Sequence, residues 1–340
     1  MQQSPIIILG IESSCDDTSA AIIQDGKILA NVIANQDVHK AYGGVVPELA
    51  SRAHQQNIIP VVDQAIKKAG VSKEQITAVA FTNGPGLLGS LLVGSSFSKA
   101  FSIGMNIPLI EVNHMHGHIL AHFIEENDEN KNQPNFPFLC LTVSGGHTQI
   151  VKVSSYIEME ILGETIDDAA GEAFDKVAKM LNLPYPGGPI LDKNAQLGNP
   201  NKYQFTHPKV PGLNYSFSGL KTSVLYFLKK EIKKNPNFIK ENLNDICASV
   251  QKTIIDILFI ELKKAIKETG INEVAIAGGV SANSELRQRL ASFGDDYKVY
   301  IPKFEYCTDN AAMIAITGYY KYLQQDFTSL YVTPNARMKI

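Results

Sequence analysis

The chain has 340 residues, of which 44% are apolar and 19% charged, and its formal net charge at pH 7 is −3. That length exceeds what one hydrophobic core usually holds, so we expect two domains. The slightly acidic balance excludes a protein that binds nucleic acid through its overall charge, and the absence of any run of roughly 18 apolar residues excludes a membrane-spanning helix.

The first elements are predicted to be strands joined by polar turns. The apolar run Ile6–Ile11 has no cationic lead-in and stops at an acidic residue, so it is typical of a buried strand and not of a secretory signal. A second strand, Ser19–Ile23, leads into Asp25-Gly26 and a third strand, Lys27–Ile33. An Asp-Gly pair between two apolar runs predicts a hairpin turn.

A helix and a crossover unit follow. The spacing of apolar residues predicts a helix from about Pro47 to Gly70, and Ala78–Phe81 is a short strand that ends in a glycine turn. A helix of small residues, from Leu88 to Ile103, comes next. Strand, glycine turn and helix in this order are typical of a crossover in a parallel sheet.

The stretch 125–135, EENDENKNQPN, contains no apolar residue and is predicted to be a linker. After it the opening pattern recurs, with a strand Phe138–Val143, a polar turn and a strand Gln149–Val153. Two strand–turn–strand openings, each at the head of half the chain, predict two similar domains around a common cleft.

The second half continues with three predicted helices, near 169–181, 218–234 and 246–269. The strand Glu273–Ala277 then runs into Gly278-Gly279 and a new helix. This order is typical of an anion or nucleotide site, because backbone N–H groups point at the ligand. The last predicted helix is Asn310–Gln324, with Asp309 as its N-cap.

Cysteines and cations give weaker information. The four cysteines are widely spaced and form no CxxC pair, so neither a disulfide framework nor a cysteine zinc site is expected, and the reduced cytoplasm is the predicted location. A phosphate-binding surface would have to be a local basic patch. Candidate cations are Lys221, Lys229, Lys230, Lys233 and Lys234, or Arg287 and Arg289, or Arg337 and Lys339.

The sharpest candidate site is a histidine cluster. On a helix, His114, His118 and His122 lie one turn apart, so neighbouring members share a face and can hold one metal ion. Spacing alone supports metal binding and a structural role about equally. A zinc protease of the H-E-x-x-H type is disfavoured, because Met115 stands where that motif needs its catalytic glutamate.

Three acidic residues each have two interpretations. Asp16 and Asp17, after the first strand, are either turn-formers or carboxylates that serve a metal–phosphate group or act as a base. Asp175 is either part of a site or a helix-surface charge paired with Lys179. The glycine turns around 145, 187 and 278 are weak signals, because a tight turn alone explains each of them.

Ten short motifs run in order along nearly the whole chain: Gly10–Thr18, Val46–Arg52, Asn83–Leu91, Asn113-His114 with His118, Val143–Thr148, Gly171–Lys176, Tyr185–Gly188, Ser216–Thr222, Gly278–Asn283 and Cys307–Asn310. Together they resemble the tRNA N6-adenosine threonylcarbamoyltransferase family, whose members were once described as O-sialoglycoprotein endopeptidases. The resemblance implies a two-lobed α/β fold of the actin/Hsp70/sugar-kinase (ASKHA) class. It further implies an N-terminal lobe of residues 1–124 plus about 311–340, a linker 125–135 and an adenylate-binding C-terminal lobe 136–310.

The resemblance also implies the site residues. His114, His118 and Asp309 match the family's metal ligands, which hold Fe²⁺ or Zn²⁺. Asp175 and Asp192 are expected to take the ribose hydroxyls of a bound threonylcarbamoyl-AMP. The full set of positions that match its binding residues is Thr142, Val143, Ser144, Gly145, Gly146, Asp175, Gly188, Asp192 and Asn283.

The implied reaction moves the threonylcarbamoyl group from threonylcarbamoyl-AMP to N6 of adenosine 37 in tRNAs that read codons beginning with A. Asp16 or Asp17 is expected to assist loss of the N6 proton. Bacterial members of the family work with an inactive paralogue and a small P-loop ATPase, so the resemblance implies the same partners for this chain, which has no P-loop of its own. Two positions depart from the family, since many bacterial members have glutamate in place of His116 and others have it in place of Asp17.

Two alternatives remain besides the protease. A kinase or chaperone of the same fold would use carboxylate-held Mg²⁺ and would need no imidazole ligands, so the histidine pair disfavours it. A non-catalytic scaffold, like the inactive paralogue, is disfavoured because all three proposed metal ligands are present.

Overall fold

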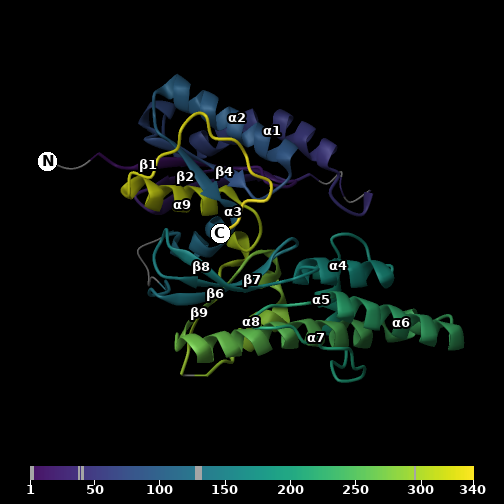
Figure 1. Ribbon diagram of the computed structural model, residues 1–340. Helices are drawn as coiled ribbons and strands as arrows, with labels where there is room; N and C mark the ends of the chain where they lie inside the picture. Colours follow the sequence, from purple (N-terminus) through teal and green to yellow (C-terminus); the bar gives the residue numbers. More distant parts are fainter. Residues whose placement is uncertain (1–3, 37–38, 40–41, 127–131, 295) are drawn as a thin grey trace. The chain divides into compact units, whose positions relative to one another are not determined.

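The computed structural model describes residues 4–36, 39, 42–126, 132–294 and 296–340 (Figure 1). The chain forms two compact units. The first contains Met1–Gln133, Ser154–Met159 and Pro302–Ile340, and the second contains Pro134–Val153 and Glu160–Ile301. The segment 302–310, which the sequence interpretation assigned to the second lobe, therefore belongs to the first unit. The expected linker falls partly on residues 127–131, outside the described residues.

The first unit is built on a mixed sheet with the strand order β3-β2-β1-β4-β5. Neighbours β1, β2 and β3 pair antiparallel, whereas β4 runs parallel to both β1 and β5. Asp25 and Gly26 have φ values of 49° and 85°, which confirms the predicted hairpin turn. The strands are β1 (Ile7–Glu12), β2 (Thr18–Gln24), β3 (Lys27–Ala34), β4 (Ala78–Gly84) and β5 (Leu109–Asn113).

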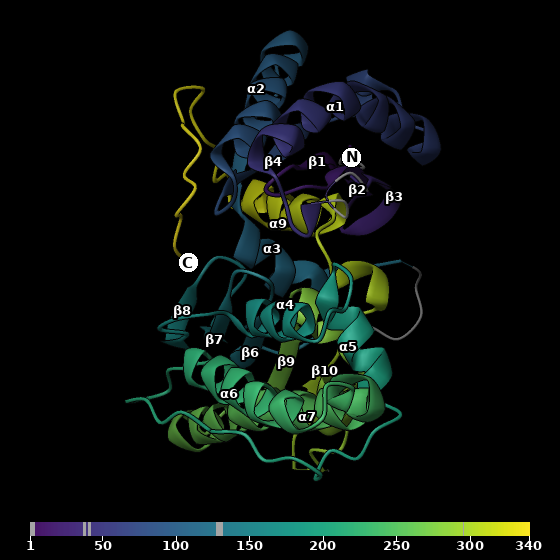
Figure 2. The ribbon, with the colours of Figure 1, turned by 90° about the vertical axis from the view of Figure 1, so that its right-hand side faces the viewer.

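Helices cover both faces of this sheet. Figure 2 shows α1 and α2 on one side and α9 on the other. Because side chains alternate along β1, Leu9 joins a buried cluster with Ile58 and Val62 of α1, while Gly10 faces α9. The helices are α1 (Pro47–Ala69), α2 (Leu88–Met105), α3 (His114–Leu120) and α9 (Ala311–Leu323).

The second unit repeats the plan with the strand order β10-β9-β6-β7-β8. Its central strand β6 is antiparallel to β7 and parallel to β9, as β1 is to β2 and β4. This repetition confirms the predicted duplicated α/β architecture. The strands are β6 (Phe138–Val143), β7 (Thr148–Val153), β8 (Met159–Glu164), β9 (Glu273–Ala277) and β10 (Lys298–Tyr300).

The helices of the second unit differ from the predicted ones in two places. The helix α5 (Gly187–Ala195) occupies a stretch interpreted as a glycine turn, and α7 begins at Phe238, before the predicted start near 246. The other helices are α4 (Ala170–Met180), α6 (Ser218–Lys234) and α8 (Ser284–Ala291). All four cysteines are free thiols, as expected. Among the described residues, no helix combines the length and apolar character that crossing a membrane requires.

The contact between β1 and α9 leads to a prediction about stability. A Cβ on Gly10 would lie 2.6 Å from the backbone oxygen of Ala311 and 2.7 Å from Cβ of Ala315. Since backbone cannot yield as a side chain does, we expect Gly10→Ala to lower the free energy of unfolding by about 1–3 kcal/mol in urea denaturation. Gly104→Ala is the matched control, because a Cβ there meets nothing within 4 Å. Equal stability of both variants would contradict the close packing.

Candidate functional site

Two of the predicted metal ligands lie on α3, directly after β5. His114 and His118 are one helical turn apart, their ring centroids are 4.7 Å from each other, and both side chains are buried. The helix ends at Leu120, so His122 lies in the following turn. The predicted three-histidine face is therefore wrong at its third member, and two histidines share the face.

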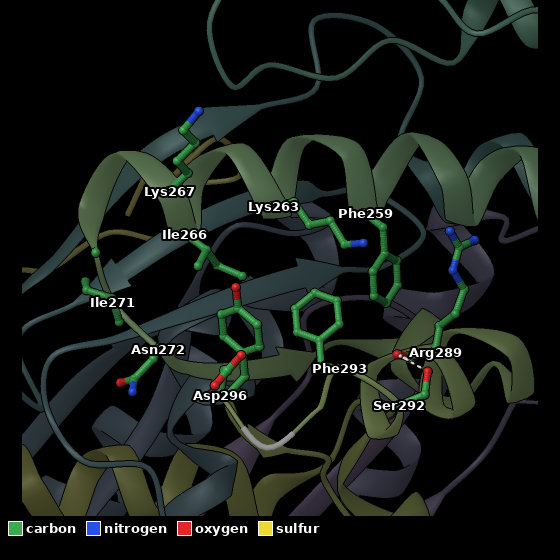
Figure 3. A pocket seen from close by; sticks show the side chains of 12 residues that line it. Phe259, Lys263, Ile266, Lys267, Ile271, Asn272, Arg289, Ser292, Phe293 and Asp296 are labelled. Carbon is green, nitrogen blue, oxygen red and sulfur yellow. Dashed lines mark hydrogen bonds between the residues drawn. The ribbon is translucent and has the colours of Figure 1, made fainter.

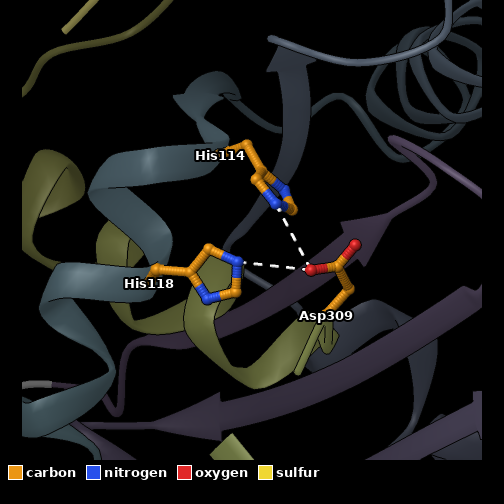
Figure 4. A group of neighbouring side chains, drawn as sticks. All are labelled: His114, His118 and Asp309. Carbon is orange, nitrogen blue, oxygen red and sulfur yellow. Dashed lines mark ion pairs between the residues drawn. The ribbon is translucent and has the colours of Figure 1, made fainter. Parts of the chain in front are cut away.

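Asp309 comes to this face from the turn before α9 (Figure 4). Its Oδ1 lies 3.4 Å from Nε2 of His114 and 3.2 Å from Nε2 of His118. The prediction that Asp309 caps α9 is wrong, because Oδ1 of Asn310 accepts the capping hydrogen bond from the backbone N–H of Met313 at 3.1 Å. Since Asn310 caps the helix, the carboxylate of Asp309 is left to face the histidines.

The three side chains fit a divalent metal ion. One potential ligand atom from each residue lies within 4.8 Å of the other two. Nδ1 of His118 is buried and has no hydrogen-bond partner in the described part of the chain, and the buried Nε2 faces the carboxylate of Asp309 at 3.2 Å. A metal ion at Nε2 would compensate the cost of burying this imidazole beside a carboxylate. Two histidines and one carboxylate leave coordination positions open, a donor set typical of iron and zinc.

Glu12, the last residue of β1, supports this centre and was not predicted from the sequence. Its Oε2 lies 2.9 Å from Nδ1 of His114 and accepts a hydrogen bond from the hydroxyl of Thr82 at 2.7 Å. Its Oε1 accepts a hydrogen bond from the backbone N–H of Ser14. A proton on Nδ1 that donates to Glu12 leaves Nε2 of His114 free for a metal.

The charges at this centre favour a cation. Burial opposes the charged form of His114, yet the carboxylates of Glu12 and Asp309 raise its pKa well above the ordinary value. Burial likewise opposes the charged form of Asp309, but His114 and His118 hold the pKa of that carboxyl below its usual range. The imidazole of His114 also lowers the pKa of Glu12, although burial acts to raise it. The buried carboxylate of Glu12 and the partly buried one of Asp309 therefore require positive charge between them.

The polar turn after β1 carries Asp16 and Asp17, and a buried histidine fixes it. Nε2 of His54 lies 3.0 Å from the carbonyl oxygen of Cys15, and Nδ1 lies 2.7 Å from the hydroxyl of Thr18. Burial, followed by repulsion from Asp16 and Asp309, raises the pKa of Asp17 to about 7. A carboxyl with that pKa can exchange a proton near neutral pH, so Asp17 is a candidate acid or base.

A pocket in the second unit contains most of the other predicted residues. Backbone N–H groups of Gly187 and Gly188, at the start of α5, donate to Oδ1 of Asp175 at 2.9 and 3.1 Å. This favours the site interpretation of Asp175 over a surface pair with Lys179. The pocket has a volume of about 250 Å³ and is lined by Gly145, Gly171, Phe174, Asp175, Pro186, Gly188, Pro189, Asp192, Gly279, Val280, Ala282 and Asn283.

Gln251 of α7 joins two of these pocket residues and was also missed. Its Nε2 donates to Oδ1 of Asp192 at 3.0 Å, and its Oε1 accepts from Nδ2 of Asn283 at 2.8 Å. Asp192 also accepts from the backbone N–H and hydroxyl of Ser284, at the start of α8. Asn283 caps the same helix by accepting from the N–H of Leu286 at 3.0 Å. The pocket wall is therefore one hydrogen-bonded network.

Four predicted binding residues do not belong to this lining. Thr142 and Val143 are fully buried in β6. Ser144 accepts a hydrogen bond from the N–H of His147 through its hydroxyl and so closes the turn between β6 and β7. Gly146 lies in the same turn. In the described chain, then, β6 positions the turn while Gly145 reaches the pocket.

A second hollow of the same unit lies at the end of α7 (Figure 3). Two aromatic rings of this hollow lie next to cations of the chain itself. The guanidinium of Arg289 lies 4.9 Å from the ring of Phe259, and Nζ of Lys263 lies 5.7 Å from the ring of Phe293. Arg289 also pairs with Asp256 at 2.6 Å. These contacts give the residues a structural role, and none of the predicted site residues lines the hollow.

Comparisons of the whole sequence agree with the motifs. A family model described as tRNA N6-adenosine threonylcarbamoyltransferase matches residues 27–316. A protein of that name from Christiangramia forsetii is 63% identical over 341 residues, covering 100% of each chain. Another, from Riemerella anatipestifer, is 62% identical over 342 residues, covering 100% of this chain and 99% of the relative.

Two solved structures share the fold at low identity. Component A of (R)-2-hydroxyglutaryl-CoA dehydratase from Acidaminococcus fermentans has a TM-score of 0.53 at 16% identity and covers 94% of this chain and 99% of its own. HypF from T. kodakarensis has a TM-score of 0.62 at 14% identity, over 96% of this chain and 50% of its own. These similarities concern the fold alone, and they confirm the predicted ASKHA-type architecture.

The contact between Glu12 and His114 leads to a prediction about metal affinity. Carboxylates that orient a metal-binding imidazole are typically worth 10–100-fold in affinity. We therefore expect Glu12→Gln to weaken Zn²⁺ binding by about that factor in competition with a chromophoric chelator, and His118→Ala to abolish it. Glu268→Gln, at an exposed position, is the matched control. Unchanged affinity in Glu12→Gln, with the metal-free protein equally stable, would contradict the orienting role.

Proposed function

The chain belongs to the tRNA N6-adenosine threonylcarbamoyltransferase family, and on that premise we propose that it transfers a threonylcarbamoyl group from threonylcarbamoyl-AMP to N6 of adenosine 37 in tRNAs that read codons beginning with A. The observation that carries the proposal beyond family membership is the convergence of His114, His118 and Asp309 from distant segments. Neither a kinase nor a chaperone needs these imidazoles. The target base has to be accessible, and an unpaired loop of tRNA meets that condition.

In the proposed reaction the lone pair of N6 attacks the carbamoyl carbon, the bond from that carbon to the phosphate oxygen breaks, and AMP leaves with the bonding electrons. The N6 proton has to be taken up by a base. His114, His118 and Asp309 would hold Fe²⁺ or Zn²⁺, which supplies Lewis-acid stabilisation of the charge that develops on oxygen.

The pocket of the second unit is proposed to hold the adenylate part of the donor. Oδ1 of Asp175 is engaged by two backbone N–H groups, and no partner of Oδ2 is found among the described residues, so that oxygen can accept from a ribose hydroxyl. Asp192 is held in place by Gln251 and Ser284 and faces the same pocket. The glycines of the lining allow close approach of the ligand to the backbone.

Protein partners are part of the proposal. An inactive paralogue and a small P-loop ATPase would form a complex with this chain. The reaction would take place in the cytoplasm, where tRNA is modified. Exposed apolar side chains on α1 and α2 support a protein interface on the first unit. They are Ile59, Leu92 and Ile103, with exposed fractions of 67%, 46% and 62%.

The proposed function predicts which changes abolish transfer. With unmodified tRNA, threonylcarbamoyl-AMP and Zn²⁺ or Fe²⁺, wild type should form the modified adenosine, and His114→Ala and Asp309→Ala should lower the rate by at least about a hundredfold because each removes a metal ligand. Nucleoside analysis by mass spectrometry measures the product. Lys68→Ala is a control at an exposed position. A metal-loaded wild type that leaves tRNA unmodified, even with the partner proteins added, would refute the proposal.

The role of Asp17 predicts a pH dependence. Its pKa is raised from 3.8 to about 7 by burial and by Asp16, Asp309 and Glu12, and a hydrogen bond from the backbone of Gln36 acts in the opposite sense. As a base it works only when deprotonated, so transfer should rise with pH and level off above its pKa. A bound cation would offset part of the repulsion from Asp309. The pH at which the rate levels off should therefore lie between the ordinary pKa of aspartate and about 7.

Asp17→Asn should lower the rate of transfer by about 10²–10⁴-fold and remove its rise with pH, because the amide cannot accept the proton. Asp17→Glu keeps a carboxylate and should retain a pH-dependent rate. Single-turnover rates measured from pH 5 to pH 9 test both statements. If the rate of Asp17→Asn rises with pH as that of the wild type does, another group is the base.

A further inference from the structure

After α9 the chain crosses the first unit as a segment that we call the strap, residues 328–340, drawn in yellow in Figure 2. Backbone hydrogen bonds fix its path. The N–H of Thr328 donates to the carbonyl of Leu109 at 2.8 Å, and the N–H of Asn335 donates to the carbonyl of Asn83 at 2.8 Å. The strap is thus attached at the start of β5 and near the end of its neighbour β4.

The strap continues to the helix that carries the candidate metal ligands. Nδ2 of Asn113 donates to the carbonyl of Lys339 at 2.9 Å. Oδ1 of the same Asn113 caps α3 by accepting from the N–H of Met115 at 2.9 Å, and His114 is the first residue of that helix. One asparagine therefore connects the strap to the metal centre.

From Tyr331 to the end of the strap, side chains alternate between two environments. Val332, Pro334, Ala336 and Met338 are partly buried, and Val332 packs against the core of the unit. The intervening side chains are exposed, namely Tyr331, Thr333, Asn335, Arg337 and Lys339. The alternation continues through a turn, in which the N–H of Met338 donates to the carbonyl of Asn335 at 3.1 Å, so the strap is anchored by its partly buried side chains and presents a row of polar ones.

The exposed row has the chemistry of a nucleic-acid surface. Tyr331 is 94% exposed, although a large aromatic side chain normally buries most of its surface. Within the described part of the chain, neither Arg337 nor Lys339 forms an ion pair, so both cations are free to meet an anion. An unpaired aromatic ring beside free cations is how single-stranded RNA is bound, by stacking and by phosphate contacts.

A hollow of about 750 Å³ lies between the strap and the sheet, lined by Asn83, Leu88, Glu111 and residues 331–338 of the strap. The carboxylate of Glu111 is engaged there by Nδ2 of Asn83 at 2.6 Å and by the hydroxyl of Thr328 at 3.3 Å. A carboxylate repels phosphate but accepts hydrogen bonds from the amino groups of bases. The hollow therefore suits a nucleic-acid base, while the phosphates of the RNA would lie outside it, near Arg337.

We propose that the strap is an RNA-binding surface, on which Arg337 and Lys339 contact phosphates of the tRNA anticodon loop and Tyr331 stacks on an unpaired base beside the hollow. The inference rests on the proposed function for the identity of the RNA. Its position follows from the geometry, because the strap ends at the asparagine that caps the metal-binding helix. Leu330 of the strap is also exposed, at 44%, but the exposed side chains that follow Tyr331 are polar or cationic, and this favours RNA over a protein partner, which would need an apolar centre.

The test is the affinity of the metal-loaded full-length protein for an unmodified tRNA transcript and for the isolated anticodon stem-loop. We expect the double substitution Arg337→Ala/Lys339→Ala to raise Kd about tenfold for both RNAs and to lower the salt dependence of log Kd by about 1.4, since each phosphate contact on a single strand contributes about 0.7. Tyr331→Ala should also raise Kd about tenfold, without changing the salt dependence.

Two exposed residues outside the strap provide matched controls. Lys68→Ala removes a cation and Tyr226→Ala an aromatic ring with an exposed fraction of 67%, and neither should change Kd. In transfer assays the strap variants should raise KM for tRNA and leave KM for threonylcarbamoyl-AMP and metal stoichiometry unchanged. These readouts separate an RNA contact from a general loss of structure.

Three outcomes would overturn the proposal. The first is unchanged affinity of the strap variants for the stem-loop. The second is a loss that Lys68→Ala and Tyr226→Ala reproduce. The third is weakened binding of a partner protein with unchanged RNA affinity, which would make the strap a protein-docking surface. Failure of the proposed function is distinguishable, because wild type would then bind RNA without transferring the group.

Discussion

The close packing of α9 on the sheet of the first unit is the constraint on which the candidate metal centre depends. Gly10 on β1 and Gly318 on α9 meet the opposite element without a side chain, and a Cβ on Gly318 would lie 2.4 Å from Cβ of Ala80. A larger residue at either position would push the helix outward. Asp309 stands just before that helix, so its distances of 3.2 and 3.4 Å to the two histidines are set by a contact of the core.

The second determinant is electrostatic. Glu12 is fully buried and Asp309 lies across His114 from it, so two carboxylates share one imidazole. Burying carboxylates together costs free energy unless positive charge compensates them. Without a metal, protonated His114 supplies positive charge; a divalent cation at Nε2 would take the place of the Nε2 proton and supply more. The raised pKa of Asp17 has a related origin, because burial raises it and repulsion from Asp16, Asp309 and Glu12 adds to the effect of burial.

How far the sequence reveals this arrangement depends on the range of the interactions. The hairpin at Asp25-Gly26 and the bounds of β6, β9 and α6 follow from local turn chemistry and periodicity, so the sequence predicts them well. The helix α5 was missed because Pro-Gly-Gly-Pro has the composition of a turn. Its first N–H groups are satisfied by Asp175 of another helix, a contact without local signal.

The supporting polar residues were missed for a related reason. Glu12 ends a buried strand and Gln251 lies within a long helix, and both positions are equally consistent with solvent-facing side chains. Only the register of β1 against β4, which brings Thr82 to Glu12, shows that the carboxylate points inward. The candidate ligands His114, His118 and Asp309 were predicted from the family resemblance, since spacing alone left the histidines undecided.

Asparagines cap three helices that carry or adjoin candidate site residues. At two of them, next to the candidate metal ligands, the lack of charge on asparagine explains the choice. Asn113 caps α3, Asn283 caps α8 and Asn310 caps α9. Aspartate would cap as well as asparagine does. At residue 310, however, aspartate would add a carboxylate directly beside Asp309, and at residue 113 it would add one beside His114. It would also lose the amide that Asn113 donates to the strap. The neutral cap therefore satisfies the helix while leaving the charge of the candidate metal centre to the residues that face it.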